Sequence, residues 1–589
     1  MPLDTLSPTP QVGAVTAVPL PFAPSASWTG AVRRLAAEKG AFYDEGAGML
    51  KIPFGSPGYH TTLTGGEVHP IRESLWYAVV LLDTGRPADV ERAVVIFDRV
   101  LALQDAGPET SPTHGIWPWF LEESLVQMSP PDWNWADFCA AQILEALLTH
   151  RSRFPAGLVE RMEAAVRRAC FSIRRRRVSP GYTNIAIMGC FVTMAAGEAF
   201  DDGELFAYGL ERLREFRDHT VAHGAFSEYN SPVYTLVALA ELGRFFHHVR
   251  HAEALEIAGA LYRRAWEEIA FHYHAPTAQW AGPHSRCYHT LAKPEQHALL
   301  QRAVARGEEP EGDWVPEPGA HRIRHTCPDD LCERMIQRTE VETIRQRFIK
   351  GSVDVVGTTH LTPRYALGTI NHGDLWNQRR ALLAFWGDAE RPSYLHLRCL
   401  HDGRDFAAAV LFSVQDESRV LGGVSFAHDA GDSHPNLDMI RDRTITARDL
   451  RLRFEFGGAA GATEPLLPAG EVAFRVDAAG ITLDLQVPFS RWGEVPGRLE
   501  TGSGGGIAWI DVVLHSGPET VIDLGTLAAA GVVFALELEP GRARMSPATV
   551  GRDGSFCDAA WAGLRLRTPV VPDTQKRLIE SYRVSGSVV

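Results

Sequence analysis

Apolar residues recur with helical spacing through the first half of the chain. Between residues 28 and 274 they return every three or four positions, in segments separated by short links that contain Gly, Pro or Asp. Paired helices in series predict an array of helical hairpins, and such an array closed on itself forms an α/α toroid. The predicted helices span residues 68–82, 88–103, 135–150, 155–173, 183–199, 205–219, 231–248 and 252–272.

The apolar period changes to two in the second half, from about residue 343. Alternating segments separated by Gly-rich turns are typical of an antiparallel β-sandwich. The predicted strands span residues 353–357, 394–398, 407–414, 450–456, 472–476, 481–487, 507–514 and 531–538. The sequence therefore predicts an N-terminal arm (1–27), a helical toroid (28–335) whose last part, 275–335, is loop-rich, and a sandwich domain (336–589).

Composition narrows the function classes. The chain of 589 residues is 45% hydrophobic and carries a net charge of −14, which argues against a general binder of nucleic acid or of membrane surfaces. No apolar run is long enough to span a bilayer, and the start of the chain shows no secretory signal, so we expect a cytoplasmic protein. The cysteines form no CxxC pair and are expected to be buried thiols.

The segment 223–235, His-Gly-Ala-Phe-Ser-Glu-Tyr-Asn-Ser-Pro-Val-Tyr-Thr, is the richest in polar and aromatic side chains. Asn230 or Ser231 can cap the helix that follows, and a capped helix with a buried tyrosine explains the segment without any chemistry. Helix openings in a toroid meet at one rim, however. Glu228, Tyr229, Asn230 and Tyr234 are therefore expected to lie close together at a cleft, with Tyr229 and Asn230 as substrate-binding residues.

A second segment, 179–190, begins an apolar helix with Thr183 and Asn184. Asn184 can be a simple cap. If Thr183 caps the helix instead, the Asn184 amide is left to face a ligand. The run from Arg174 to Arg177 lies just upstream, where it forms a solvated edge or attracts an acidic sugar.

These two segments together resemble motifs of the heparinase II/III-like polysaccharide lyases and related oligo-uronate lyases. The resemblance lies in an Asn-led helix followed some fifty residues later by Gly-Ala-Phe-Ser-Glu-x-x-Ser-Pro-x-Tyr. It implies a helical toroid followed by a β-sandwich. It also implies that Asn184 neutralises a uronate carboxylate, that Tyr234 is the catalytic tyrosine, and that Glu228 is a structural or substrate-contacting glutamate.

The chain departs from the family pattern at three points. Ile185 follows Asn184 where the family often has His, and His223-Gly224 stands where Asp-Gly is common. The motif places no partner histidine. β-Elimination needs a neutralised carboxylate, a base and an acid, which amide, Arg, His and Tyr side chains can supply.

Two further segments contain candidate partners. Residues 280–289 hold His284, Arg286, Tyr288 and His289 in a predicted loop, and functional loops often have this composition. Satisfied surface histidines explain the same segment. Residues 371–378 of the sandwich domain, which include His372, are predicted to lean over the cleft.

Tryptophans alternate with polar residues in segments 114–123 and 132–138. This pattern suits stacking on sugar rings and hydrogen bonds to hydroxyls, and it also suits an aromatic lining between helices. The candidate substrate-binding residues here are Trp117, Trp119, Asp132, Trp133 and Asn134.

Metal binding is weakly indicated. His428, Asp429 and His434 lie close in sequence and can join His396 or His401 around a divalent ion, although polar turns explain them as well. No phosphate-binding Gly loop or zinc-ribbon cysteine pattern is present, and no cofactor is expected.

The sequence favours a lyase that cleaves uronate-containing oligo- or polysaccharides, with Tyr234 as acid and base, Asn184 as carboxylate neutraliser, and His284 with Arg286 as the supporting pair. The expected partner is an acidic glycan. One alternative is a toroid glycoside hydrolase that uses Glu228 with a second carboxylate; the candidates are Asp132, Asp137 and Glu122. Another alternative is a non-catalytic carbohydrate-binding protein.

Overall fold

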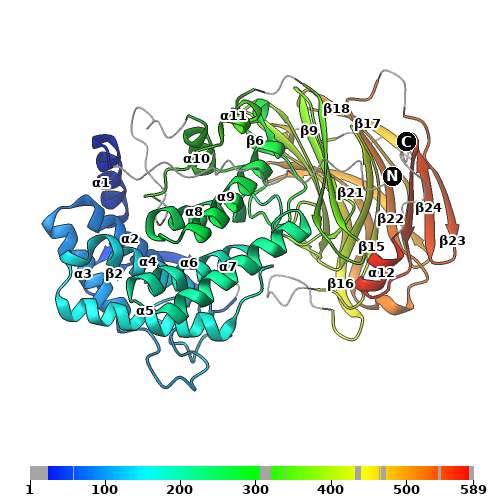
Figure 1. Ribbon diagram of the computed structural model, residues 1–589. Helices are drawn as coiled ribbons and strands as arrows, with labels where there is room; N and C mark the ends of the chain where they lie inside the picture. The colour runs from blue at the N-terminus through cyan, green and yellow to red at the C-terminus, as the bar shows by residue number, and fades with distance from the viewer. Residues whose placement is uncertain are drawn as a thin grey trace.

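Helices make up the first half of the molecule and antiparallel sheets the second half (Figure 1), which confirms the predicted fold class. The computed structural model describes residues 24–56, 59–305, 319, 321–337, 340–431, 440–462, 464–465, 473–541 and 545–582. Within them, no helix is both long enough and apolar enough to cross a membrane. The predicted arm therefore lies largely outside the described residues, and the first helix begins at Ala26.

The helical half follows the predicted pattern closely, and three of the predicted helices coincide with the observed ones. The segment expected to be loop-rich also contains two helices, α10 and α11. The helices are α1 (Ala26–Gly40), α2 (Ile71–Thr84), α3 (Pro87–Leu101), α4 (Trp135–His150), α5 (Ala156–Arg176), α6 (Thr183–Ala199), α7 (Gly203–His223), α8 (Tyr234–His248), α9 (Ala252–His272), α10 (Pro294–Val304), α11 (Asp329–Ile336) and, after the sheets, α12 (Gln575–Ser581).

The helices form a curved array of hairpins. Helices α2, α4, α6 and α8 contact one another in turn as an inner row, while α3, α5, α7 and α9 each pair with the preceding inner helix. Helix α6 is buried on all sides from Thr183 to Gly197, as expected for an inner helix. Because each outer helix returns the chain, the inner helices run in the same direction and their N-termini meet at one rim. The candidate residues precede or begin these helices.

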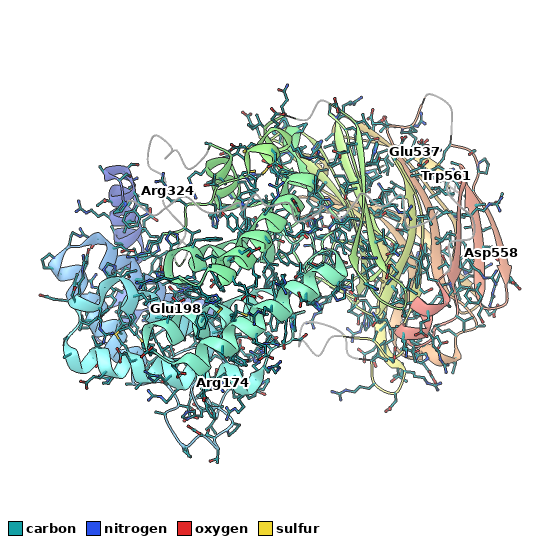
Figure 2. The ribbon with its side chains drawn as sticks, viewed as in Figure 1. Arg174, Glu198, Arg324, Glu537, Asp558 and Trp561 are labelled. Atoms are coloured by element: carbon teal, nitrogen blue, oxygen red, sulfur yellow. The ribbon has the colours of Figure 1, made fainter. Side chains whose placement is uncertain are left out.

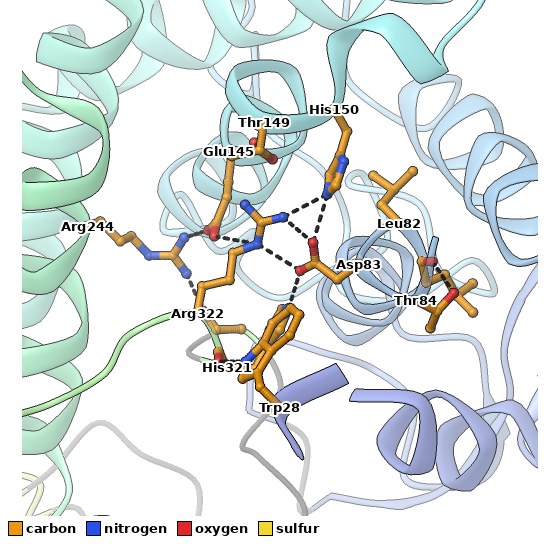
Figure 3. Close-up of polar contacts among 12 residues, drawn as sticks. Trp28, Leu82, Asp83, Thr84, Glu145, Thr149, His150, Arg244, His321 and Arg322 are labelled. Atoms are coloured by element: carbon orange, nitrogen blue, oxygen red, sulfur yellow. Dashed lines mark hydrogen bonds and ion pairs between the residues drawn. The ribbon is translucent and has the colours of Figure 1, made fainter. Parts of the chain in front are cut away.

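A buried cluster of charges holds the inner helices together (Figure 3). Asp83 of α2 accepts hydrogen bonds from His150 of α4 and from His321 and Arg322 of the segment after α10. Arg244 of α8 donates to Glu145 of α4 in the same cluster, and Arg322 lies 3.9 Å from that carboxylate. The cluster therefore joins three inner helices to a segment distant in the sequence.

Two large antiparallel sheets pack face to face in the second half. The nine-stranded sheet has the order β20-β21-β16-β12-β11-β9-β8-β7 with β13 beside β12; the seven-stranded sheet has the order β10-β14-β15-β22-β18-β17 with β19 beside β18. Alternating apolar residues from both sheets form one core, for example Leu395, Phe454, Leu485 and Phe534. A third sheet, β23-β24-β25, covers the outer face of the seven-stranded sheet, and Trp561 of β24 (Figure 2) belongs to the core between them.

The strands of these sheets are β7 (Glu342–Ile349), β8 (Val355–Leu361), β9 (Tyr365–Ile370), β10 (His372–Asp374), β11 (Leu382–Gly387), β12 (Pro392–His401), β13 (Arg404–Asp405), β14 (Ala409–Asp416), β15 (Arg419–Phe426), β16 (Thr444–Gly458), β17 (Ala473–Ala478), β18 (Ile481–Trp492), β19 (Val495–Pro496), β20 (Arg498–Gly504), β21 (Ile507–Asp523), β22 (Ala530–Leu538), β23 (Thr549–Asp553), β24 (Phe556–Trp561) and β25 (Leu564–Pro569). Short hairpins within the helical half are formed by β1 (Tyr43–Asp44), β2 (Met49–Leu50), β3 (Ile52–Gly55), β4 (Gly65–Val68), β5 (Tyr273–His274) and β6 (Gln279–Trp280).

The two halves meet along β7–β9 and β11. A side chain at Gly368 of β9 would stand 1.9 Å from the carbonyl oxygen of Gly282, so only glycine permits this close approach. Tyr229, just before α8, stacks on Phe348 of β7 with ring centroids 4.3 Å apart. The sheet domain thereby supports the loops that carry the candidate site.

Candidate active site

Glu228 lies beside the N-terminus of α6. Its Oε1 accepts a hydrogen bond of 2.7 Å from Arg286, while its buried Oε2 forms no hydrogen bond of ordinary geometry. Burial raises the pKa of the Glu228 carboxyl, and Arg286 and the backbone N–H groups of Asn184 and Thr183 offset part of that rise. The carboxyl is therefore poised to gain a further partner.

Asn184 occupies the first turn of α6 and is 4% exposed. Its Oδ1 is buried without a hydrogen-bond partner, and neither Asn184 nor Thr183 caps the helix, whose N-cap residue is Tyr182. A buried amide oxygen without a partner costs free energy unless a ligand or water supplies one. Capping therefore does not explain Asn184.

Arg286 connects the helix openings of the site to a loop of the sheet domain. Its guanidinium lies 4.2 Å from the ring centroid of Tyr234 and 5.4 Å from that of Trp376. Besides its hydrogen bond to Glu228, the guanidinium donates two hydrogen bonds to Oε1 of Gln378, from Nε at 3.0 Å and from Nη2 at 2.9 Å. One cation is thus held between a helix opening and a loop of the sheet domain.

Tyr234 begins α8, and its hydroxyl oxygen lies 2.5 Å from that of Tyr288. Burial raises the pKa of Tyr234 strongly, and the charge of Arg286 opposes the rise. The phenol therefore keeps its proton at neutral pH. Tyr288 is 48% exposed, so this pair lies where the site opens toward solvent.

A row of polar and aromatic side chains leads from this pair to the opening of α4. Asn134 donates a 3.1 Å hydrogen bond to the hydroxyl of Tyr182, and Arg176 donates to the Asn134 amide oxygen. Asp132 accepts from the indole of Trp119 at 3.2 Å and from the backbone of Asn134 at 3.0 Å. The charges of Asp132, Arg286 and Glu228 all act on Tyr182, which is therefore close to both ends of the row.

Several predicted site residues have structural roles instead. Trp117 is fully buried and donates to the carbonyl of Val100, and Tyr229 is buried against the sheet domain. His372 is buried beside Tyr582 in the sheet domain. Burial of Trp117 agrees with the alternative of an aromatic lining between helices, and burial of Tyr229 agrees with the alternative of a buried tyrosine before the helix.

His284 also differs from expectation. It is buried, its Nε2 donates a 2.9 Å hydrogen bond to the carbonyl of Trp280, and its Nδ1 has no hydrogen-bond partner. Burial lowers the pKa of His284 to about 3, so the ring is neutral at physiological pH. Its backbone pairs with Arg380, which aligns the loop that carries Arg286. His284 is thus a buried structural residue rather than a partner of Arg286.

The remaining predicted residues differ in burial and in their contacts. Trp133 is half-buried and donates to the carbonyl of Pro112, and His289 is exposed one residue after Tyr288. Asp137 is buried within α4, where burial raises its pKa to about 8. Glu122 contacts His69.

No group of three or more His, Cys, Asp or Glu among the described residues is arranged to hold a metal ion. His428 lies 3.8 Å from Asp573, and Asp429 accepts the backbone N–H of Gln575 at the start of α12. His434 lies outside the described residues. His428 and Asp429 thus anchor the last helix.

A family model described as a domain of unknown function (DUF8769) matches residues 41–306. No curated protein matches the chain. Among solved structures, the chain is similar to heparinase III (10% identity, 95% of this chain and 93% of that chain covered, TM-score 0.47). It is also similar to a chondroitin AC lyase variant from Streptomyces coelicolor A3 (13% identity, 93% and 86% covered, TM-score 0.46) and to a Paenibacillus xanthan lyase (9% identity, 95% and 62% covered, TM-score 0.45).

Sequence reasoning missed Tyr182, Trp376 and Gln378 as parts of the site. Tyr182 stands two residues before Asn184, at the same helix opening, and this proximity was the available indication. Trp376 and Gln378 lie in segment 371–378, which was expected to lean over the cleft, but His372 was the residue of that segment predicted to belong to the site. Which side chains of a loop turn toward a neighbouring domain depends on tertiary packing.

Proposed function

We propose that the protein is a carbohydrate-active lyase that cleaves uronate-containing glycans by β-elimination. The observation that carries the proposal is the convergence of Asn184, Glu228, Tyr234 and Arg286 from three separate segments, in which Oδ1 of Asn184 has no hydrogen-bond partner and Oε2 of Glu228 has none of ordinary geometry. Amide, carboxyl, phenol and guanidinium groups are the groups that this chemistry requires.

In the proposed reaction, the Nδ2 group of Asn184 and the hydroxyl of a protonated Glu228 donate hydrogen bonds to the uronate carboxylate and stabilise the charge that spreads onto it as the α-proton leaves. The raised pKa of Glu228 favours its protonated, hydrogen-bond-donating form. The electron pair of the broken C–H bond forms a double bond, and the bond to the sugar oxygen on the neighbouring carbon breaks. No water is consumed.

Tyr234 is proposed to move the proton. Its phenolate removes the α-proton, and the resulting phenol donates that proton to the departing oxygen. The charge of Arg286 lowers the pKa of Tyr234 and so stabilises the phenolate, while the Tyr288 hydroxyl lies 2.5 Å from its oxygen. Burial raises the pKa of Tyr234, so its phenolate forms only toward alkaline pH. The turnover number is therefore expected to rise in that direction.

Product analysis on a panel of acidic glycans tests the proposal. A lyase yields products with a conjugated double bond, which absorb in the ultraviolet, and their summed mass equals that of the substrate. A hydrolase adds one water per cleavage. Oxygen from labelled water in the products, without new absorbance, would contradict the proposal.

A glycoside hydrolase is the second candidate, favoured by the raised pKa of Glu228, which suits a general acid. Asp132, at the other end of the row through Tyr182, is then the second carboxylate. The same product analysis distinguishes the two reactions.

A further inference from the structure

Two segments of the candidate site are joined by a set of buried hydrogen bonds centred on Asn230. The first segment, 228–234, carries Glu228 and Tyr234, and the second, 280–288, carries Arg286 and Tyr288. The contacts between these four side chains require the two segments to keep a fixed relative position.

Asn230 uses its whole side chain for this connection. Its Nδ2 donates to the carbonyls of Ala281 (2.9 Å) and Pro283 (2.8 Å), and its Oδ1 accepts from the indole of Trp280 (2.5 Å). The residue is fully buried and has a left-handed backbone with φ of 42°. Asn is among the few residues besides Gly that adopt this conformation readily, so both its backbone and its amide suit the position.

Serine hydroxyls and one carboxylate complete the connection. Ser285 donates from its Oγ to the carbonyl of Tyr229 (2.5 Å), and Ser231 donates to the carbonyl of Arg286 (2.6 Å) while accepting from the backbone of Tyr234 (3.0 Å). Glu268 of α9, which is buried, accepts the backbone N–H of Asn230 at 2.6 Å. These contacts fix the turn against the helix behind it.

We infer that Asn230 is a positioning residue that sets Arg286 and Tyr288 against Glu228 and Tyr234, without contacting the substrate. The inference rests on the proposed function for its kinetic consequences. A shift of about 1 Å in a reacting group can cost on the order of a hundredfold in rate. Loss of the Asn230 amide therefore acts on turnover through the position of Arg286.

The test compares wild-type protein with Asn230→Ala, measuring turnover on a cleaved acidic glycan as a function of pH. We expect kcat to fall by about tenfold to a hundredfold, with KM nearly unchanged. Arg286 lowers the pKa of Tyr234, so its displacement should move the rising limb of the kcat profile to higher pH. The groups facing that phenol are Arg286, Tyr288 and Glu228. Unchanged kcat with an unmoved limb would overturn the inference.

Gln486→Ala is the matched control. Gln486 is a buried amide in the sheet domain that donates to the carbonyl of Ser546 (2.7 Å) and accepts from the backbone of Ala548 (2.9 Å). Its loss should lower thermal stability and leave kcat and the pH profile unchanged. A matching loss of kcat in this control would show that general destabilisation, not positioning, causes the effect, and would overturn the inference.

Ser285→Ala serves if Asn230→Ala fails to fold, because it removes one hydroxyl from the same connection. It should shift kcat and the pH limb in the same direction by a smaller factor, and no shift would overturn the inference.

If the wild-type protein forms no unsaturated product from any acidic glycan, the proposed function fails, and crystal structures of wild type and variant decide the inference separately. Persistence of the Arg286–Glu228 and Tyr234–Tyr288 contacts in the variant would overturn it.

Discussion

Two buried carboxylates in the helical half, Asp83 and Glu228, have opposite environments. Each oxygen of Asp83 accepts two hydrogen bonds, from His150, His321 and Arg322. Burial alone would raise the pKa of Asp83, but these donors outweigh it and hold the pKa well below its usual range. Glu228 has Arg286 as its side-chain partner, and burial raises the pKa of Glu228.

The difference separates a structural role from a chemical one. A carboxylate whose hydrogen-bonding capacity is filled keeps its charge and ties segments together, and it has nothing left to offer a ligand. A buried carboxyl with an open oxygen, beside an amide in the same condition, stores a cost that a bound substrate can relieve. Substitutions in the two clusters should therefore affect different quantities.

Asp83→Ala should have the largest effect on stability. It removes the carboxylate that Arg322 and two buried imidazoles share, and breaking a buried charge pair in this way costs about 3–5 kcal/mol. Denaturant unfolding measures the loss. Because the folded pKa of Asp83 is lowered, its contribution is present above the unfolded pKa and is lost as pH falls through the folded value, so the gap between wild type and variant should narrow in acid. If the variant kept its stability but lost turnover per folded molecule, Asp83 would have a role in the chemistry rather than in the structure.

Tyr234→Phe should have the largest effect on turnover. It removes the hydroxyl that pairs with Tyr288 but keeps the ring beneath Arg286. Groups that transfer protons typically contribute about 10²–10⁴ in rate, so kcat should fall at least a hundredfold. The melting temperature, measured beside kcat, should stay close to that of wild type. Full activity would rule out Tyr234 as the proton-transferring group.

Asn184→Ala should lower turnover without a loss of stability. Donors that stabilise developing charge typically contribute about 10²–10³ in kcat. Removing a buried amide oxygen that has no partner should leave the free energy of unfolding unchanged or slightly higher. Denaturant unfolding and initial rates on the same preparation test both statements. A clear loss of stability with normal turnover would show that Asn184 has a structural role and not a chemical one.

Glu228→Gln should have the smallest effect on stability, with a sign opposite to that of Asp83→Ala. The folded pKa of Glu228 is raised, so ionisation of Glu228 destabilises the native state as pH rises. The neutral amide should therefore stabilise the protein at neutral pH by no more than about 1 kcal/mol, and this gain should vanish in acid. Melting curves across pH test it, and destabilisation at neutral pH would show that the ion pair with Arg286 dominates.

The fold could be predicted from local patterns because the burial of each helix or strand leaves a period of apolar residues in its own sequence. An inner helix such as α6 must be apolar, and the strands of a sandwich must alternate, so the period shows in the sequence. Helices α10 and α11 were missed because they are short and lie between Pro-rich links. Within the site, the helix opening predicted that Glu228 and Tyr234 lie close together, whereas His284 and His372 came from segments chosen for their polar and aromatic composition.

By itself, the sequence determined the order of helical and sheet domains, the helix openings, and the side chains that these openings bring to one rim. Only the tertiary structure decided which polar residues keep free hydrogen-bonding capacity. Asn230 and Asn184 are the same residue type beside similar helix starts, yet the amide of Asn230 is saturated by Trp280, Ala281 and Pro283, and Oδ1 of Asn184 has no partner. Hydrogen-bond saturation depends on segments that are distant along the chain, so no local pattern encodes it.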